Sequence, residues 1–321
     1  MQKFTVASLF AGVGGIDLGF KQTGKFSTVY ANEFDPYPAE TFEKNFNLKV
    51  DCRDIRLVQP GDIPKVDGLL FGFPCQPFSI SGYRLGFNDP KDRGNLFFEV
   101  MRLVHETRPR FLVAENVKNL VGHDNGHTFK VVLDALRTEG YKPKYKVLNT
   151  MEYGNLPQHR ERIYIVAFQN EEDYKRFEFP KPVKLTKNLS DIIDFGNKLP
   201  EKYYYTPGKY KGNIYEKLVD AMDNPDTVYQ WRRRYVRKNK SGVVPTLTAN
   251  QGEGGHNVCL IKTGFGIRKM TPRECFNAQG FPKDFKLPEQ ADSRLYKQAG
   301  NCVSVSVINR IAENIVSALN N

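Results

Sequence analysis

The sequence has few cysteines, and their arrangement excludes several classes of protein. The five cysteines among 321 residues are Cys52, Cys75, Cys259, Cys275 and Cys302. Their number is odd, their spacings are wide and no CxxC pair occurs, which disfavours a disulfide framework or a zinc site and suits a reducing cytosol. The five histidines form no HExxH or similar cluster, so the sequence predicts no metal site.

A long apolar run is also missing. No stretch approaches the roughly 20 apolar residues of a membrane-spanning helix, so we expect no membrane partner. The first residues, MQKFTVASLFAGVGG, place Lys3 before an apolar stretch, as a signal peptide would. Thr5 and Ser8 interrupt that stretch, and a glycine turn and Asp17 follow it, so we interpret the segment as a first strand.

Positive charge is in excess. Lysine and arginine number 47 against 36 acidic residues, a formal net charge of +11. Such a balance favours a polyanionic partner, nucleic acid first among them, and a generic basic surface is the alternative. With 40% hydrophobic residues, the chain is long enough for one large core, or for a large domain and a smaller one.

Apolar runs alternate with helical patterns over residues 1–180. Strands are expected at 4–10, 27–32, 66–73, 110–116, 145–149 and 162–168, and helices at 95–108 and 128–140. This rhythm predicts an α/β fold with a doubly wound sheet. Residues 181–280 are richer in Tyr, Asn, Gly, Lys and Arg, with less regular periodicity, and predict a smaller domain. Residues 281–321 are expected to form a hinge and an amphipathic helix that returns to the first domain.

A glycine turn follows the first expected strand. SLFAGVGGIDLGF places Gly12, Gly14 and Gly15 between a strand and a helix, where a ligand can approach the backbone. The GxGxxG fingerprint is not met because its sixth position is Asp17, so NAD is disfavoured while a nucleoside ligand is not. Glu33 ends the second strand, where a carboxylate can accept both ribose hydroxyls. The alternative is a packing turn beside a surface acid.

Two other strands end in residues that carry chemistry. One runs into Pro74 and Cys75 and the other into Glu115. Because ligands gather at the carboxyl ends of strands in such sheets, a thiol and a carboxylic acid are expected to meet at one edge. A thiolate is a strong nucleophile, and a carboxylic acid can donate a proton to the electrophile it attacks. The alternative for Cys75 is a small buried apolar residue.

Basic residues form two further signals. Arg160 and Arg162 alternate on an expected extended segment, where they can hold a carboxylate and an acceptor oxygen of a substrate, or lie at the surface. Between Arg232 and Lys240, six basic residues are interleaved with aromatic ones, ahead of the glycine-rich PTLTANQGEGG. That composition favours a surface that grips phosphates and inserts loops among bases; the alternative is a solvated basic hairpin.

Taken together, these stretches resemble the DNA (cytosine-5)-methyltransferase family of the bacterial type II restriction–modification kind. FAGVGG, NEFDPY, GFPCQPFSISG, RGNLFFEV, ENVKNL, QHRERIYIV, TPRECFNAQGFP and AGNCVSV stand in the family's order. The resemblance covers most of the chain. It implies an S-adenosylmethionine-dependent, Rossmann-like catalytic and cofactor-binding domain over 1–180. Residues 181–280 would be the target-recognition domain.

The resemblance implies a mechanism. The Cys75 thiolate would attack C6 of a cytosine flipped out of duplex DNA, which makes C5 nucleophilic toward the methyl group of S-adenosylmethionine. Glu115 would protonate or hydrogen-bond N3, Arg162 would contact O2, and Arg160 would help to order the site. The other product is S-adenosylhomocysteine.

By the same resemblance, residues across the chain are expected to contact cofactor and DNA. Asp54 and Ile55, after an expected third strand, would meet the adenine, and Glu33 would hold the ribose. The full cofactor set is Phe10, Ala11, Gly12, Gly14, Glu33, Asp54, Ile55, Pro74, Leu96, Asn301 and Val303. Cys302 departs from the serine of many relatives and puts a second thiol near this set. The expected DNA contacts are Ser81, Arg232, Arg233, Arg234, Thr246 and Leu247; the three arginines can read guanines or hold phosphates.

Other functions remain open at this point. A tRNA cytosine-5 methyltransferase on the same scaffold is the main alternative, a catalytically silent DNA-binding protein is the second, and an NAD-dependent enzyme is the most distant. We expect a monomer on double-stranded DNA in the bacterial cytoplasm, associated with the nucleoid. A cognate restriction endonuclease acting separately is a further expected partner.

Overall fold

The computed structural model describes residues 3–73, 96–232, 234–239, 241–251 and 259–320. Within it the chain forms two compact units. Unit 1 comprises Met1–Leu148, Glu161–Lys181 and Val307–Asn321, and unit 2 comprises Asn149–Arg160 and Pro182–Ser306. The chain thus leaves unit 1 close to the expected boundary at residue 180. Residues 149–160 and 281–306, which we expected outside the smaller domain, pack with unit 2.

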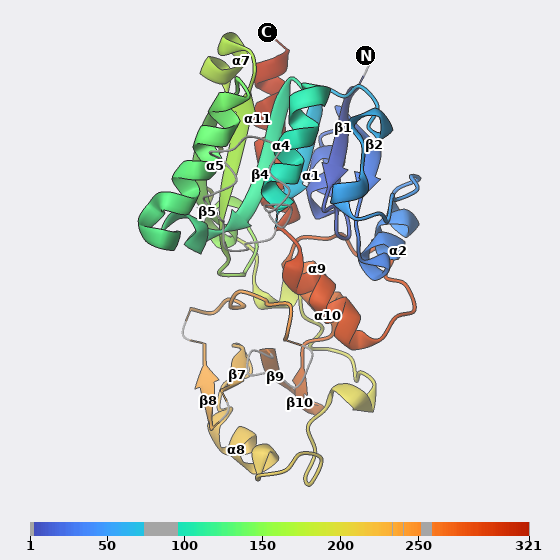
Figure 1. The fold of residues 1–321 in the computed structure, drawn as a ribbon. Helices are drawn as coiled ribbons and strands as arrows, with labels where there is room; N and C mark the ends of the chain where they lie inside the picture. Colours follow the sequence, from blue (N-terminus) through green and yellow to red (C-terminus); the bar gives the residue numbers. More distant parts are fainter. Residues whose placement is uncertain (1–2, 74–95, 233, 240, 252–258, 321) are drawn as a thin grey trace. The chain divides into compact units, whose positions relative to one another are not determined.

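Unit 1 is built on a six-stranded sheet (Figure 1). The strands are β2 (Phe26–Asn32), β1 (Phe4–Leu9), β3 (Gly68–Gly72), β4 (Phe111–Val117), β6 (Glu161–Phe168) and β5 (Lys142–Asn149), in that spatial order. The first four pair in parallel, and β6 pairs antiparallel to β4. The order changes direction between β1 and β3, so the loops after these two strands diverge. That opening is where doubly wound sheets bind their ligands, and the expected fold class is confirmed.

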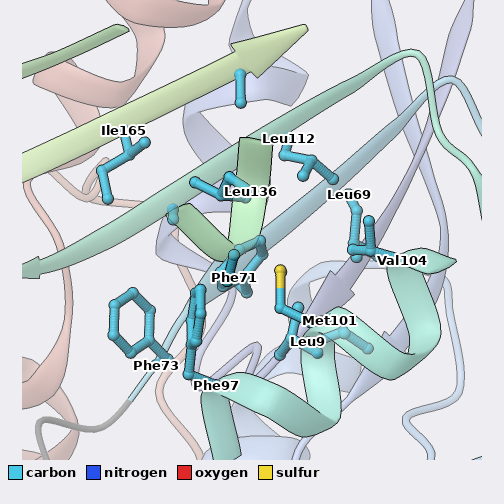
Figure 2. Close-up of a cluster of buried hydrophobic side chains, with 14 of the residues drawn as sticks. Leu9, Leu69, Phe71, Phe73, Phe97, Met101, Val104, Leu112, Leu136 and Ile165 are labelled. Carbon is cyan, nitrogen blue, oxygen red and sulfur yellow. The ribbon is translucent and has the colours of Figure 1, made fainter. Parts of the chain in front are cut away.

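Helices cover both faces of this sheet. Its helices include α1 (Gly15–Gln22), α2 (Pro36–Asn45), α4 (Leu96–Thr107), α5 (His127–Thr138), α7 (Glu171–Arg176) and α11 (Val305–Leu319). Apolar side chains of α4 and α5 meet those of the strands in one buried cluster, as Figure 2 shows for Phe97, Met101 and Leu136. On the opposite face α1 and α11 touch, because Gly19 has no side chain to keep Ile308 away. The core is therefore double-sided, as the continuous apolar strands predict.

Unit 2 contains a smaller antiparallel sheet. Its strands are β8 (Tyr235–Lys238), β7 (Tyr229–Arg232), β9 (Cys259–Thr263) and β10 (Gly266–Lys269), with β7 between β8 and β9. Its helices include α6 (Thr150–Tyr153), α8 (Ile214–Ala221), α9 (Pro272–Ala278) and α10 (Asp292–Asn301). Leu218 and Met222 from the α8 region pack against Tyr229, Leu260 and Ile267 of the sheet in a separate small core.

The segment Asp292–Leu319 has the length and composition of a membrane-spanning helix, with a mean hydropathy of 1.3 in its most apolar window. It consists of α10 and α11, and 61% of that window is buried inside the protein. A core helix has these same properties. We therefore assign the apolar character of the segment to packing within the protein.

A buried carboxyl lies beneath the turn that follows β1. Asp17, in the first turn of α1, is fully buried and accepts hydrogen bonds from the hydroxyls of Ser8 (2.9 Å) and Thr28 (2.9 Å). Burial raises the pKa of Asp17 to about 6, against the opposing effect of these two hydrogen bonds. The folded protein therefore holds this proton more tightly than the unfolded chain does.

We expect Asp17→Asn to stabilise the protein at neutral pH and not in acid. The contribution of Asp17 to the free energy of unfolding falls as pH rises from about 4 to about 6, and it stays low at higher pH. The neutral amide of asparagine does not ionise, so above about pH 6 the variant avoids a loss of up to about 3 kcal/mol in the free energy of unfolding. Thermal melts at about pH 4.5 and about pH 8 should show a gap between variant and wild type that widens with pH. Asp134→Asn, at a half-exposed carboxylate that pairs with Arg137 on α5, is the surface control, and a constant gap for Asp17→Asn would contradict the assignment.

Candidate active site

The carboxyl ends of β1, β2, β3 and β4 lie along one edge of the unit 1 sheet. The register places Leu9 opposite both Asn32 and Phe71, and Gly72 opposite Glu115. Each of these strands is followed by a segment that the sequence singled out. Because these strands are parallel and adjacent, the glycine turn, Glu33 and Phe73 follow the ends of β1, β2 and β3 at this edge, and Glu115 lies near the end of β4.

The glycine turn and Glu33 are joined directly. The Gly12 amide donates to Glu33 Oε2 at 2.9 Å, and the Asp35 amide donates to Oε1 at 2.8 Å. Phe10 takes a left-handed conformation, with φ of 51°, which stores backbone strain at the start of the turn. The Ala11 amide bonds the Asn32 carbonyl at 3.0 Å. Hydrogen bonds therefore join two segments whose bonded residues Gly12 and Glu33 are 21 positions apart in the sequence.

Two glycines of this turn are required for different reasons. At Gly14 (φ +82°) a side chain would collide with the rings of Phe42 and Phe46, so this glycine permits close packing of α2. At Gly12 (φ +56°) a side chain would meet no heavy atom within 4 Å. The space above Gly12 is open, and a ligand can contact its backbone there.

Glu115 forms an ion pair with Arg162. The Nε–Oε1 distance is 3.1 Å, and both side chains are largely buried, with 11% of Glu115 and 13% of Arg162 exposed. The pair spans β4 and β6, in which Val117 lies opposite Arg162. A carboxyl beside a strand end with a fixed guanidinium at its flank can serve as a hydrogen-bond donor or acceptor toward a bound base.

Asn116 is a residue that the sequence reasoning missed. Its side chain is buried, donates to the Phe73 carbonyl at 2.9 Å and accepts from the Val117 amide at 2.7 Å. Phe73 is the last described residue before Pro74 and Cys75. Asn116 thus ties the end of β4 to the start of the segment that carries the expected nucleophile. Its position between Glu115 and the following turn was the available signal.

The Asp54 turn differs from the expected arrangement. The expected third strand before Asp54 is a single bridge between Asn32 and Asp51, and η1 (Ile55–Leu57) follows it. Asp54 caps η1 and pairs with Arg56, at 2.9 Å to Nε, which lowers the pKa of this carboxyl. Ile55 is buried in the cluster against which Leu96 of α4 also packs. Ile55 and Leu96, two of the expected cofactor residues, therefore contact the same apolar cluster.

Phe34 is a second missed residue. It directly follows Glu33, and 67% of its side chain is exposed. An exposed phenylalanine beside a carboxylate at a strand end provides a face on which a planar base can stack. The aromatic residue in NEFDPY was the signal in the sequence.

Arg160 has partners different from those of Arg162. It belongs to unit 2, is 1% exposed and donates to the carbonyls of Leu247 (2.8 Å), Gly300 (3.0 Å) and Cys302 (2.5 Å). Thr246 donates to the His159 carbonyl at 2.8 Å. The Leu247 side chain is 1% exposed, and its contact with DNA stays a prediction. Asn301, which is exposed, and Val303, which is buried, follow in the same unit.

The basic hairpin presents two different faces. Tyr229 belongs to the small core of unit 2, and Trp231 and Val236 pack against it. On the other face Arg232 lies opposite Tyr235, which is 60% exposed. Arg234 is also exposed, in the turn between β7 and β8. The alternation of strand side chains therefore puts Trp231 and Arg232 on opposite faces of the hairpin.

Four expected site residues, Pro74, Cys75, Ser81 and Arg233, lie outside the described residues. Among those that the structure describes, no group of three or more His, Cys, Asp or Glu side chains is arranged to hold a metal ion.

Comparison with known proteins assigns the family. The model of the C-5 cytosine-specific DNA methylases matches residues 4–317. Type II methyltransferase M.Bsp6I of Bacillus sp. (strain RFL6) is 58% identical over 98% of this chain and 99% of its own. Type II methyltransferase M.HhaI of Haemophilus parahaemolyticus is 37% identical over 97% and 94%. The crystal structure of the S. pombe Dnmt2 methyltransferase shares the fold, with a TM-score of 0.75 at 18% identity over 99% and 100% of the two chains.

These matches agree with the order of motifs and with the strand-end geometry. The expected family is confirmed, and the identities above 30% over nearly the whole length cover both units. The chain belongs to the C-5 cytosine-specific DNA methylase family and is a DNA cytosine-5 methyltransferase.

Proposed function

We propose that the protein methylates C5 of one cytosine within a specific duplex-DNA sequence, with S-adenosylmethionine as the donor. The target base is flipped out of the duplex and attacked at C6 by Cys75. The observation that carries this proposal is the arrangement at the edge of the sheet. Glu115 pairs with Arg162 and lies next to β3, and the Asn116 side chain donates to the Phe73 carbonyl just after β3. Names of relatives as type II methyltransferases support a role in protecting host DNA from a separate endonuclease.

The residues of the glycine turn and its neighbours fit S-adenosylmethionine. The carboxylate of Glu33 lies beside the open backbone at Gly12, where a strand-end acid can accept ribose hydroxyls. Phe10, Phe34, Ile55 and Leu96 supply apolar surface for the adenine, and Asp54 supplies an acceptor for its amino group. When bound, the donor supplies a methyl group attached to a positively charged sulfur.

The chain's own residues would carry the remaining chemistry. The Cys75 thiolate forms the bond to C6, and Glu115 donates a hydrogen bond or proton to N3, so that the ring does not build up a full negative charge. Arg162 donates to O2 and fixes the carboxyl of Glu115. Loss of the C5 proton and departure of the Cys75 sulfur then restore the aromatic ring.

Arg160 would act as a positioning residue rather than on the base. Its guanidinium binds carbonyls in both the Thr246–Leu247 segment and the AGNCV segment. These two segments approach so closely that a side chain at Gly300 would collide with the Thr248 backbone. Thr246, Arg232 and Arg234 are the described residues that we propose to face DNA, with Arg233 and Ser81 beside them.

We expect Gly12→Ala to abolish tight cofactor binding while the fold persists. The methyl group enters the open space above the turn, and the Kd for S-adenosylhomocysteine rises at least about tenfold, equivalent to roughly 1.4 kcal/mol. Calorimetric titration measures this. Gly24→Ala is the matched control, since Gly24 (φ +70°) also has no heavy atom within 4 Å of its Cβ position. Both variants lose about 1 kcal/mol of stability through backbone strain; equal cofactor affinities would contradict the placement.

The function itself is tested on nucleic acids. The purified protein, with labelled S-adenosylmethionine, should methylate duplex DNA and not tRNA. Bisulfite sequencing of a plasmid from expressing cells should then show one protected cytosine in a constant sequence context. That plasmid should also resist an endonuclease that cuts the same sequence. Transfer to tRNA alone, or absence of modified cytosine in both substrates, would overturn the proposal.

A further inference from the structure

A guanidinium joins α4 to the Asp54 turn. Arg102 of α4 donates through Nη2 to the carbonyls of Ile55 (3.3 Å) and Val58 (2.9 Å). Its Nε donates to Glu99 Oε2, one helical turn earlier, at 2.9 Å. The Arg102 side chain is 28% exposed and that of Glu99 17% exposed, so the contact is partly shielded from water. These three bonds fix the guanidinium between the helix and the turn.

The turn that Arg102 holds is short, and within it the Asp54 side chain accepts from the Arg56 amide at 3.0 Å. η1 is three residues long, closed by bonds from the Leu57 amide to Asp54 (2.8 Å) and from the Val58 amide to Ile55 (3.2 Å). So short a 3₁₀ turn does not persist by itself. The side chains of Ile55 and Val58 belong to the same buried cluster as Phe97 and Met101 of α4. Apolar packing holds the turn against the buried cluster, and the charge-assisted bonds from Arg102 fix its orientation relative to α4.

We infer that Arg102 is a positioning residue that sets the adenine side of the cofactor pocket; this rests on the proposed function. Asp54 and Ile55 lie on the turn, and Leu96 begins the helix that carries Arg102. One guanidinium therefore links the turn that carries Asp54 and Ile55 to the helix that begins at Leu96. A displaced turn would move the acceptor at Asp54 away from the adenine amino group while leaving the catalytic edge at Glu115 unchanged.

A purely structural role for Arg102 is the alternative. It would lower stability and every activity together. A positioning role predicts a selective loss: binding of S-adenosylhomocysteine and of 5′-methylthioadenosine weakens by the same factor, because both present the adenine. The Kd for duplex DNA alone and kcat at saturating donor stay unchanged. These readouts separate the two roles.

The test compares Arg102→Ala and Arg102→Lys with Arg137→Ala. Arg137 makes an i,i+3 pair with Asp134 (3.0 Å) on α5 and is exposed, so it matches the helix ion pair without the reach to a turn. We expect a rise of about tenfold in Kd for Arg102→Ala, the scale of a lost charged hydrogen bond. The Kd of Arg102→Lys should lie between those of the wild type and Arg102→Ala, because an ammonium group cannot reproduce the planar fork of the guanidinium.

Titration calorimetry, steady-state kinetics and melting temperatures decide the outcome. Unchanged Kd in both Arg102 variants, or a parallel loss of DNA binding, kcat and melting temperature, overturns the inference. If Arg102→Ala does not fold, Arg102→Lys alone gives the answer. A rise in Kd for S-adenosylhomocysteine with unchanged kcat supports the inference, and equal changes in Kd and kcat overturn it. Failure of the wild-type protein to bind S-adenosylhomocysteine would instead contradict the proposed function.

Discussion

A Cys75→Ser variant forms no covalent adduct with duplex DNA that carries 5-fluorocytosine at the target position. Its rate of methyl transfer falls by at least about four orders of magnitude, the scale on which loss of a covalent nucleophile acts. The reason is chemical: C5 of cytosine is a poor nucleophile until a thiolate adds at C6, and a serine hydroxyl is not ionised at neutral pH. The fluorine cannot leave as a proton does, so the adduct accumulates in the wild type.

Denaturing gel electrophoresis of the adduct, formed in the presence of S-adenosylmethionine, gives the measurement. Cys52→Ser is the matched control, since Cys52 is an exposed free cysteine. Cys302→Ser is a second control, because Cys302 is buried and adjoins the expected cofactor residues Asn301 and Val303. Both controls should trap DNA as the wild type does. An adduct that persists in Cys75→Ser, or disappears in Cys52→Ser, would remove the assigned nucleophile.

A Glu115→Gln variant loses about 10²- to 10⁴-fold in kcat, the range expected for an acid that assists at the transition state. Glutamine keeps an oxygen that can accept from Arg162 Nε, so the strand-end geometry survives while proton donation to N3 is lost. Cofactor affinity should stay within about twofold, because the substitution alters a side chain that pairs with Arg162, whereas the carboxylate of Glu33 is bound by the Gly12 and Asp35 amides. Single-turnover methylation of duplex DNA isolates the chemical step.

Glu161→Gln is the control for this second experiment. Glu161 neighbours Arg162 in the chain and pairs with Lys118 at 2.9 Å, in a partly exposed position. Loss of that pair should cost no more than about 1 kcal/mol of stability and little activity. A Glu115→Gln enzyme with near-normal kcat would show that Glu115 only orients Arg162. Equal losses in the two variants would point to a general effect of charge in β4 and β6.

The elements themselves were largely predictable. Strands at residues 4–9, 26–32, 68–72 and 111–117 match the expected ranges within two residues at each end. A continuous apolar run marks a strand that is buried on both faces, and its ends are visible in the sequence. The helix Leu96–Thr107 also agrees, since its buried residues recur with a helical period. The strand expected before Asp54 is absent, because only a single bridge at Asp51 pairs this segment with β2. A single bridge leaves no periodic pattern in the sequence.

Partners across long sequence separations were not predictable. Arg160 and Arg162 have the same side chain two positions apart, yet one binds carbonyls 87 to 142 residues away and the other binds Glu115. The bond from Asn116 to Phe73 crosses 43 residues, and that from Arg102 to Val58 crosses 44. Leu247 was expected at DNA from its motif, and only packing revealed that its side chain is buried.

By itself, the sequence determined the family, the doubly wound α/β sheet and the residue types at its carboxyl edge, because residue chemistry and local periodicity can be read from consecutive residues. Tertiary structure alone decided which groups hold that edge in place: Asn116 at Phe73, Arg162 at Glu115, Arg102 at the Asp54 turn, and Arg160 within unit 2. It also decided that residues 149–160 and 281–306 pack with the smaller unit. The physical reason is that a hydrogen bond or a packed side chain depends on distance in space, which a sequence pattern records only for near neighbours.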